Sequence, residues 1–230
     1  MKLVVFSDIH GNSDVLKKML VEEPPSKNTQ YICCGDIVGY YYNVKECINM
    51  LQGIENLICV RGNHDQMYIN AFFDAGLTSI LVRKYGSSYK YKDISIIEYL
   101  STLPLQKTLK IDEKNIMIQH GTPNAPLEGR IYPDTGTYAN TDTMVDIILM
   151  GHTHYCMHKI VNQIHWINPG SLGQPRDGMG FSYCVITTKP FLVEFRKLEV
   201  NMDKLKKQIQ MYDIQNSYLR EILERKKEET

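Results

Sequence analysis

Side chains of the types that bind divalent metals follow five short apolar runs of the 230-residue sequence. They are Asp8 with His10, Asp36, Asn63, His120, and His152 with His154. These residues offer imidazole nitrogens and oxygen atoms without a cysteine thiolate. Such a set suits manganese, iron or zinc, and differs from the thiolate sets of structural zinc sites.

Two of these groups pair their members two residues apart. Asp8 with His10, and His152 with His154, point the same way if the backbone is extended, as we expect here. Taken alone, each pair is typical of a capped turn or of a histidine satisfied in a core. Because five segments carry the same residue types after an apolar run, a shared site is favoured over separate turns.

The elements that must position these side chains begin with a β-α-β-α-β pattern. Strands are predicted at residues 3–6, 31–34 and 57–60, and helices at 12–21 and 44–52. This order predicts a parallel sheet with right-handed crossovers. Ligands of such sheets bind beyond the carboxyl ends of the strands, which is where the candidate side chains lie.

The later part of the chain is richer in hairpins. Helices are predicted at residues 67–85 and 93–101, hairpins at 108–119, 157–167 and 181–198, and a buried strand at 146–150. The pattern predicts two mixed sheets packed together with helices outside. We expect residues 1–200 to form one domain, with a C-terminal helix at 201–230.

A stripe of residues at helical spacing marks this C-terminal segment. Its members are Met202, Leu205, Ile209, Tyr212, Asn216, Leu219 and Leu223. The stripe predicts either a helix docked on its own domain or the seam of a homodimer, in which Asn216 would fix the register.

The composition gives no pull toward nucleic acid or a membrane, although it does not exclude binding of a long polymer. Lysine plus arginine and aspartate plus glutamate number 26 each, so no basic field favours nucleic acid or a membrane surface. The six cysteines form no C-x-x-C pair and are predicted to be buried free thiols. With no signal peptide and no long apolar run, the chain is predicted to be cytoplasmic.

Five motifs resemble, in order, those of the calcineurin-like metallophosphoesterases: Asp8-x-His10, Gly35-Asp36-x-x-Gly39, Gly62-Asn63-His64-Asp65, His120-Gly121 and Gly151-His152-x-His154. The run Asn168-Pro169-Gly170-Ser171 is similar to a turn of the small bacterial, phosphodiesterase-like branch. The resemblance implies a four-layer α/β/β/α sandwich of two mixed β-sheets flanked by helices. It also implies two divalent metal ions, with manganese favoured and iron, zinc or nickel as alternatives.

The resemblance also assigns roles to the residues. It implies that Asp8, His10 and His154 hold one metal and that Asn63, His120 and His152 hold the other, with Asp36 bridging both. A hydroxide between the metals would then attack phosphorus. His64 is implied to be the general acid, and Asp65 the residue that orients it.

Substrate contacts are less well defined by the sequence. The segment 35–40 lacks the arginine that follows this motif in the protein phosphatases. Arg61, Arg130 and Arg176 are the candidate phosphate partners, each with a structural role as the alternative. Tyr132, in the Pro- and Gly-rich segment 123–140, is predicted to face substrate together with Arg130, with a merely solvated loop as the equal alternative.

The function predicted from these residues is hydrolysis of small phosphodiesters or phosphomonoesters. The enzyme alternatives are a nuclease and a dinucleoside polyphosphate hydrolase. A non-catalytic protein-binding scaffold of the same fold is the alternative of another class. Neutral net charge argues against the nuclease, and the presence of His64 argues against the scaffold.

Overall fold

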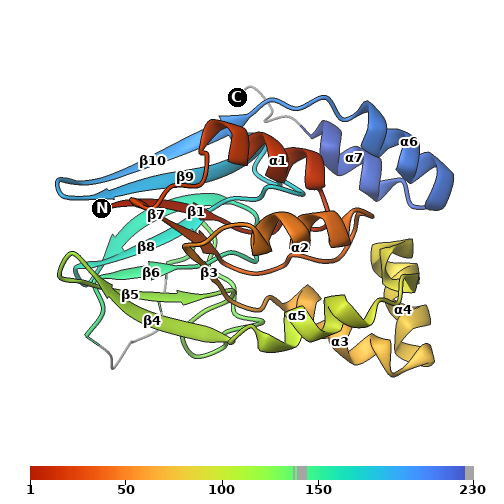
Figure 1. Cartoon of the computed structure of the whole chain (residues 1–230), viewed down its shortest axis with the longest axis horizontal. Coiled ribbons are helices and arrows are strands. Elements are labelled where there is room, and N and C mark those ends of the chain that lie inside the picture. The colour runs from red at the N-terminus through yellow and green to blue at the C-terminus, as the bar shows by residue number, and fades with distance from the viewer. Residues whose placement is uncertain (137, 139–143, 226–230) are drawn as a thin grey trace.

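A computed structural model of the chain describes residues 1–136, 138 and 144–225. Within these residues, two five-stranded mixed sheets pack face to face, and seven α-helices flank them (Figure 1). This arrangement confirms the predicted class of two mixed sheets with flanking helices. Residues 137, 139 and 140 of the segment 123–140 lie outside the described part, as do residues 141–143 and 226–230.

The first sheet contains the predicted parallel strands. In sheet order it consists of β10 (Phe191–Leu198), β9 (Phe181–Thr188), β1 (Lys2–Phe6), β2 (Thr29–Cys33) and β3 (Leu57–Cys59). Strands β1, β2 and β3 are parallel, and β9 runs antiparallel to both β1 and β10.

The second sheet combines two hairpins around a central strand. In sheet order it consists of β4 (Gln106–Ile111), β5 (Lys114–Gln119), β6 (Ile147–Leu149), β8 (Ile164–Pro169) and β7 (Cys156–Val161). Strand β6 is parallel to β5 and β8, so three strands of this sheet also end at one edge.

Alternation along each strand divides the core into layers. In β1, Leu3 and Val5 pack between the sheets with residues of β5 and β6, whereas Val4 and Phe6 pack against the helices. The helices on that side are α1 (Ser13–Glu22), α2 (Val44–Gln52), α3 (Asn63–Phe72), α4 (Ala75–Tyr85), α5 (Ile94–Thr102), α6 (Asp203–Tyr212) and α7 (Tyr218–Glu224).

The outer face of the second sheet is covered differently. Met117, Ile148 and Trp166 pack against Ile131 and Val145, which belong to the connection between β5 and β6. The described part of that connection contains no helix. This layer is therefore loop, and the helices gather against the first sheet and at one end of the sandwich (Figure 1).

The single helix predicted at residues 67–85 is wrong. Helix α3 already begins at Asn63 and ends at Phe72, and a separate helix follows. The side chain of Asp74 then accepts a hydrogen bond from the backbone N–H of Leu77 at 2.9 Å and starts α4. An N-cap of this kind competes with continuation of the preceding helix.

The single C-terminal helix predicted at residues 201–230 is also wrong, because the structure has two helices there, α6 and α7. The break contains Asn216, whose backbone N–H donates to the carbonyl of Asp213, so it marks a turn. Leu205 and Ile209 of α6 and Leu219 of α7 are buried in the core beside the first sheet. These contacts support docking on the same chain, and the homodimer stays a prediction. No helix in the described ranges has both the length and the apolar character needed to cross a membrane.

Candidate metal centre

Five loops at the carboxyl ends of strands bring the predicted metal-binding side chains together. They follow β1, β2, β3, β5 and β6, so both sheets contribute. An extended backbone was predicted for the two pairs, and this prediction is wrong. Five of these residues have positive φ angles: Asp8 (54°), His10 (50°), Asp36 (56°), His152 (69°) and His154 (64°). Such strain in residues other than glycine is typical of functional sites.

The first cluster consists of Asp8, His10 and His154. His154 Nε2 lies 3.1 Å from Asp8 Oδ1 and 3.2 Å from His10 Nε2. The Nδ1–H groups of His10 and His154 donate to the carbonyls of Val38 (2.9 Å) and Gln174 (2.5 Å). Because Nδ1 carries the proton in both rings, their Nε2 lone pairs face each other across 3.2 Å.

The second cluster consists of Asp36, His120 and His152, with Asn63 beside it. His120 Nε2 lies 3.2 Å from Asp36 Oδ2 and 3.0 Å from Asn63 Oδ1, while its Nδ1–H donates to the carbonyl of Cys34. Asp36 Oδ2 is also 3.8 Å from His10 Nε2, so this carboxylate lies between the two clusters.

The two aspartates are held in the same way. Asp8 Oδ2 accepts from the backbone N–H of His152 at 3.1 Å, and Asp36 Oδ1 accepts from that of His64 at 2.8 Å. The other oxygen of each, Asp8 Oδ1 and Asp36 Oδ2, is buried without a hydrogen-bond partner among the described residues. Buried polar atoms of this kind are costly unless a ligand satisfies them. Together with the facing lone pairs, they fit two divalent cations bound by oxygen and imidazole.

The electrostatics of the clusters agree with cation binding. Burial lowers the pKa of His10 well below its ordinary value and that of His152 to about 3, which leaves both rings in the neutral, metal-binding form. Burial would also lower the pKa of His120, but the Asp36 carboxylate raises it to about 10. The position between His120 and Asp36 therefore attracts positive charge.

Comparison with known proteins identifies the family. Residues 1–190 match the model of the calcineurin-like phosphoesterase superfamily domain. The chain belongs to this superfamily. An uncharacterized protein of Methanocaldococcus jannaschii is 30% identical over 224 residues, which cover 88% of this chain and 89% of that protein.

Two solved structures share the fold of this phosphoesterase domain. A hypothetical protein from Pyrococcus horikoshii has a TM-score of 0.76 at 20% identity, covering 96% of this chain and 97% of that one. A metallophosphoesterase from Sphaerobacter thermophilus has a TM-score of 0.74 at 22% identity and covers 98% of each chain. Their identities are low, so they support the fold alone.

In this member of the superfamily, His64 and Asp65 occupy the first turn of α3 but contact different neighbours. His64 lines a cavity of about 200 Å³ beside the two clusters. Asp65 does not orient it. Its carboxylate instead accepts hydrogen bonds from the backbone N–H groups of Asp36, Ile37, Val38 and Gly62. Burial and the imidazole of His10 lower the pKa of His64 well below its ordinary value.

The predicted substrate residues separate into three groups. Arg130 and Arg176 line the cavity, and an Arg176 N–H donates to the Tyr40 hydroxyl at 3.1 Å. Tyr132 does not line it and packs edge-on against the Tyr155 ring. Arg61 donates to the backbone carbonyls of residues 100, 101 and 103, which is a structural role.

Three tyrosines near the site were missed by sequence reasoning. Tyr40 and Tyr85 line the cavity, and the Tyr89 hydroxyl contacts His64. Tyr40 directly follows the Gly35-Asp36-x-x-Gly39 motif, and that position was a usable signal. Tyr85 and Tyr89 lie in no motif, so only the tertiary structure reveals them.

Proposed function

We propose that this chain is a two-metal phosphoesterase that hydrolyses small phosphodiesters or phosphomonoesters. The observation that carries the proposal is the pair of clusters in which buried Asp8 Oδ1 and Asp36 Oδ2 find no hydrogen-bond partner in the described part of the chain, beside inward-facing imidazole nitrogens. Asp8, His10 and His154 would hold one ion, and His120, His152 and Asn63 the other, with Asp36 between them. Oxygen and imidazole ligands suit manganese, iron or zinc, and manganese is the metal that we propose.

The chemistry divides between the ions and the chain. When bound, two divalent ions polarise the phosphoryl oxygens and activate water. The chain supplies Arg176, whose buried Nε atom has no hydrogen-bond partner among the described residues and is available to a phosphoryl oxygen. Tyr40 and Gln174 hold the same guanidinium through its Nη2 atom. Its orientation is therefore set before substrate binds.

His64 is the proposed general acid. Its burial in the cavity wall disfavours the charged ring, but a phosphate anion bound nearby opposes this because opposite charges within about 4–6 Å favour the protonated form. Arg130 lines the same cavity, close enough for its charge to act on His152, and would contact the second phosphate oxygen or the substituent.

The size of the site bears on the substrate class. A cavity of about 200 Å³ accommodates a phosphoryl group with a compact substituent. The formal net charge of zero gives no general attraction for a polyanion. We therefore favour small esters over nucleic acid.

An activity screen tests the proposal. The manganese-loaded chain is assayed with bis-p-nitrophenyl phosphate, p-nitrophenyl phosphate, cyclic nucleotides and dinucleoside polyphosphates. Turnover of at least one ester, lost on metal chelation and restored by manganese, supports it. Absence of turnover with every ester, in a preparation that carries its metals, contradicts it and favours the scaffold alternative.

A further inference from the structure

The imidazole of His64 has a close partner that no sequence motif contains. The Tyr89 hydroxyl lies 2.6 Å from His64 Nδ1, and Tyr89 is 1% exposed. The contact uses Nδ1 and leaves Nε2 as the ring nitrogen for the cavity that His64 lines. A hydrogen bond to one imidazole nitrogen sets which nitrogen is presented for chemistry.

Two residues of the sequence motifs that lie near His64, Gly39 and Asp65, do not provide this contact. A Cβ atom at Gly39, where φ is +97°, would lie 2.6 Å from His64 Nδ1, so a side chain there would collide with the ring. The Asp65 carboxylate is occupied by four backbone N–H groups. Tyr89 is thus the partner that the described residues offer to Nδ1.

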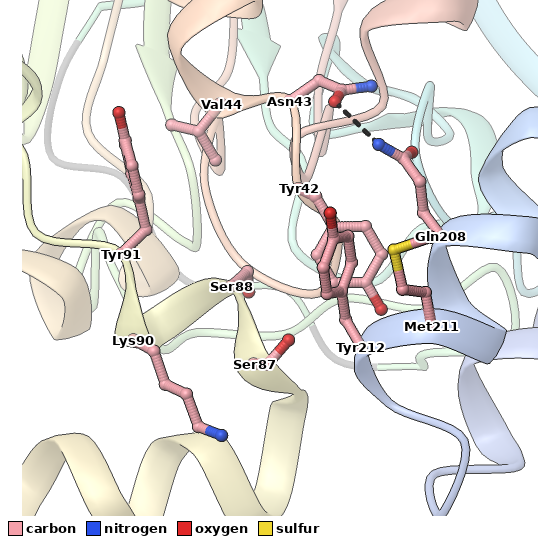
Figure 2. Close-up of a pocket in the computed structure, with 10 residues that line it drawn as sticks. All are labelled: Tyr42, Asn43, Val44, Ser87, Ser88, Lys90, Tyr91, Gln208, Met211 and Tyr212. Carbon is pink, nitrogen blue, oxygen red and sulfur yellow. Dashed lines mark hydrogen bonds between the residues drawn. The ribbon is translucent and has the colours of Figure 1, made fainter.

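The short helix that carries Tyr89 is anchored from outside the site. This 3₁₀ helix, η1 (Ser87–Lys90), begins where the Ser87 N–H and Oγ–H groups donate to the carboxylate of Asp213, at the end of α6. Its other residues border a cavity of about 600 Å³ between η1 and α6 (Figure 2). Tyr89 does not line that cavity, since its side chain points the other way, into the core.

We propose that Tyr89 is the positioning residue of the general acid His64, which holds the ring so that Nε2 delivers the proton; this rests on the proposed phosphoesterase function. A phenol can accept from Nδ1–H or donate to a bare Nδ1, so it holds the ring in either protonation state. Burial raises the pKa of Tyr89 well above its ordinary value, and the hydroxyl stays protonated.

The proton-transfer step balances with Tyr89 unchanged. As the oxygen of water bonds to phosphorus, the P–O bond to the leaving group breaks and its electron pair goes to the leaving oxygen, which takes the proton from Nε2 of the imidazolium. The remaining Nδ1–H then donates to the Tyr89 oxygen, and the neutral ring regains a proton from solvent that balances the one lost by the attacking water. Tyr89 touches neither substrate nor metal in this scheme and acts only through His64.

The variant Tyr89→Phe removes the hydroxyl and keeps the ring. On a cyclic nucleotide, whose leaving group is an alkoxide, we expect kcat to fall about 10-fold to 100-fold, by analogy with removal of the hydrogen-bond partner of a metal-binding histidine. On bis-p-nitrophenyl phosphate the fall should be less than about 3-fold, because p-nitrophenolate needs little protonation. In a His64→Ala background, Tyr89→Phe should change neither rate further. Equal losses on both esters, or an undiminished effect without His64, would overturn the proposal.

A measurement independent of turnover separates this proposal from the proposed function. In ¹⁵N-histidine NMR spectra, Tyr89→Phe should shift the His64 Nδ1 resonance and the balance between its tautomers. Tyr68→Phe is the matched control, since it removes another buried hydroxyl, bonded to the Tyr91 carbonyl, from a ring packed on Tyr89. It should leave the His64 signals and the leaving-group dependence unchanged. If wild type hydrolyses no ester, the function fails while the spectra still test the contact. Unchanged His64 signals in Tyr89→Phe would refute the contact itself.

Discussion

The carboxylate of Asp65 accepts a hydrogen bond from the backbone N–H of Asp36 at 3.0 Å. The same carboxylate accepts from the next two N–H groups of that loop, at 2.9 and 3.1 Å. It therefore holds the backbone at the point where Asp36 has a φ of 56°. The conformation that places Asp36 between the two clusters depends on a side chain of the neighbouring loop.

Asp65→Asn tests this bracing role. The amide replaces one acceptor with a donor that faces N–H groups, which should cost about 1–3 kcal/mol of unfolding free energy. Metal affinity should fall because Asp36 loses its fixed position, and both ester types should slow alike. Thermal unfolding and metal titration check this. A selective loss with poor leaving groups would instead show that Asp65 acts through His64.

His64→Ala tests the general acid. Turnover of a cyclic nucleotide should fall by about 10²–10⁴-fold, since proton donation contributes only in the transition state. The loss should be much smaller for bis-p-nitrophenyl phosphate, and both metals should stay bound. His158→Ala, which removes an exposed imidazole on β7, is the control and should change neither rate. Loss of a metal along with His64 would make His64 a ligand and not the acid.

The docking of α6 leads to a prediction about stability. Ile209 is fully buried against the core, so Ile209→Ala should lower the unfolding free energy by about 2–5 kcal/mol. Met211 is 73% exposed on the same helix, and Met211→Ala should have little effect. Denaturant unfolding of both variants checks this.

Sedimentation of the wild type, which we expect to be monomeric, completes the test of α6. A wild-type dimer that dissociates in Ile209→Ala would favour the homodimer seam instead.

Asp93 gives a pH-dependent contribution to stability. Its side chain accepts from the N–H of Ser95 at the start of α5, and the hydrogen bonds from Ser95, with Lys45 nearby, hold the pKa of Asp93 below its ordinary value of 3.8. A lowered pKa means that the stabilisation is present above about pH 4 and is lost as the pH falls further. The difference in Tm between wild type and Asp93→Asn should therefore shrink between pH 7 and pH 3. A difference that is constant over this range would contradict the assignment.

Much of the fold follows from the sequence because its signals are local. The apolar runs that become β1, β2 and β3 alternate with amphipathic helices, and this order is decisive for parallel pairing. The break at Asp74 was missed because apolar residues continue on both sides of it. Helical periodicity does not show that a side chain caps a new helix.

The site residues also differ in whether a local sequence signal predicts them. The clustering of the candidate metal-binding residues could be predicted because each follows a strand and differs in type from its apolar surroundings. The role of Asp65 could not be predicted from the sequence, because the start of α3 sets the direction of its side chain. Tyr89 lies 25 residues from His64 along the chain, and the two meet only in the tertiary structure, where Asp213 anchors η1 and Tyr89 packs in the core.

Metal analysis of the manganese-loaded chain tests the central claim most directly. We predict two manganese ions per chain in the wild type and in the control His158→Ala. In Asp36→Asn both ions should bind more weakly, because the carboxylate between the clusters loses its charge. One ion or none per wild-type chain under saturating manganese would contradict the two-metal account.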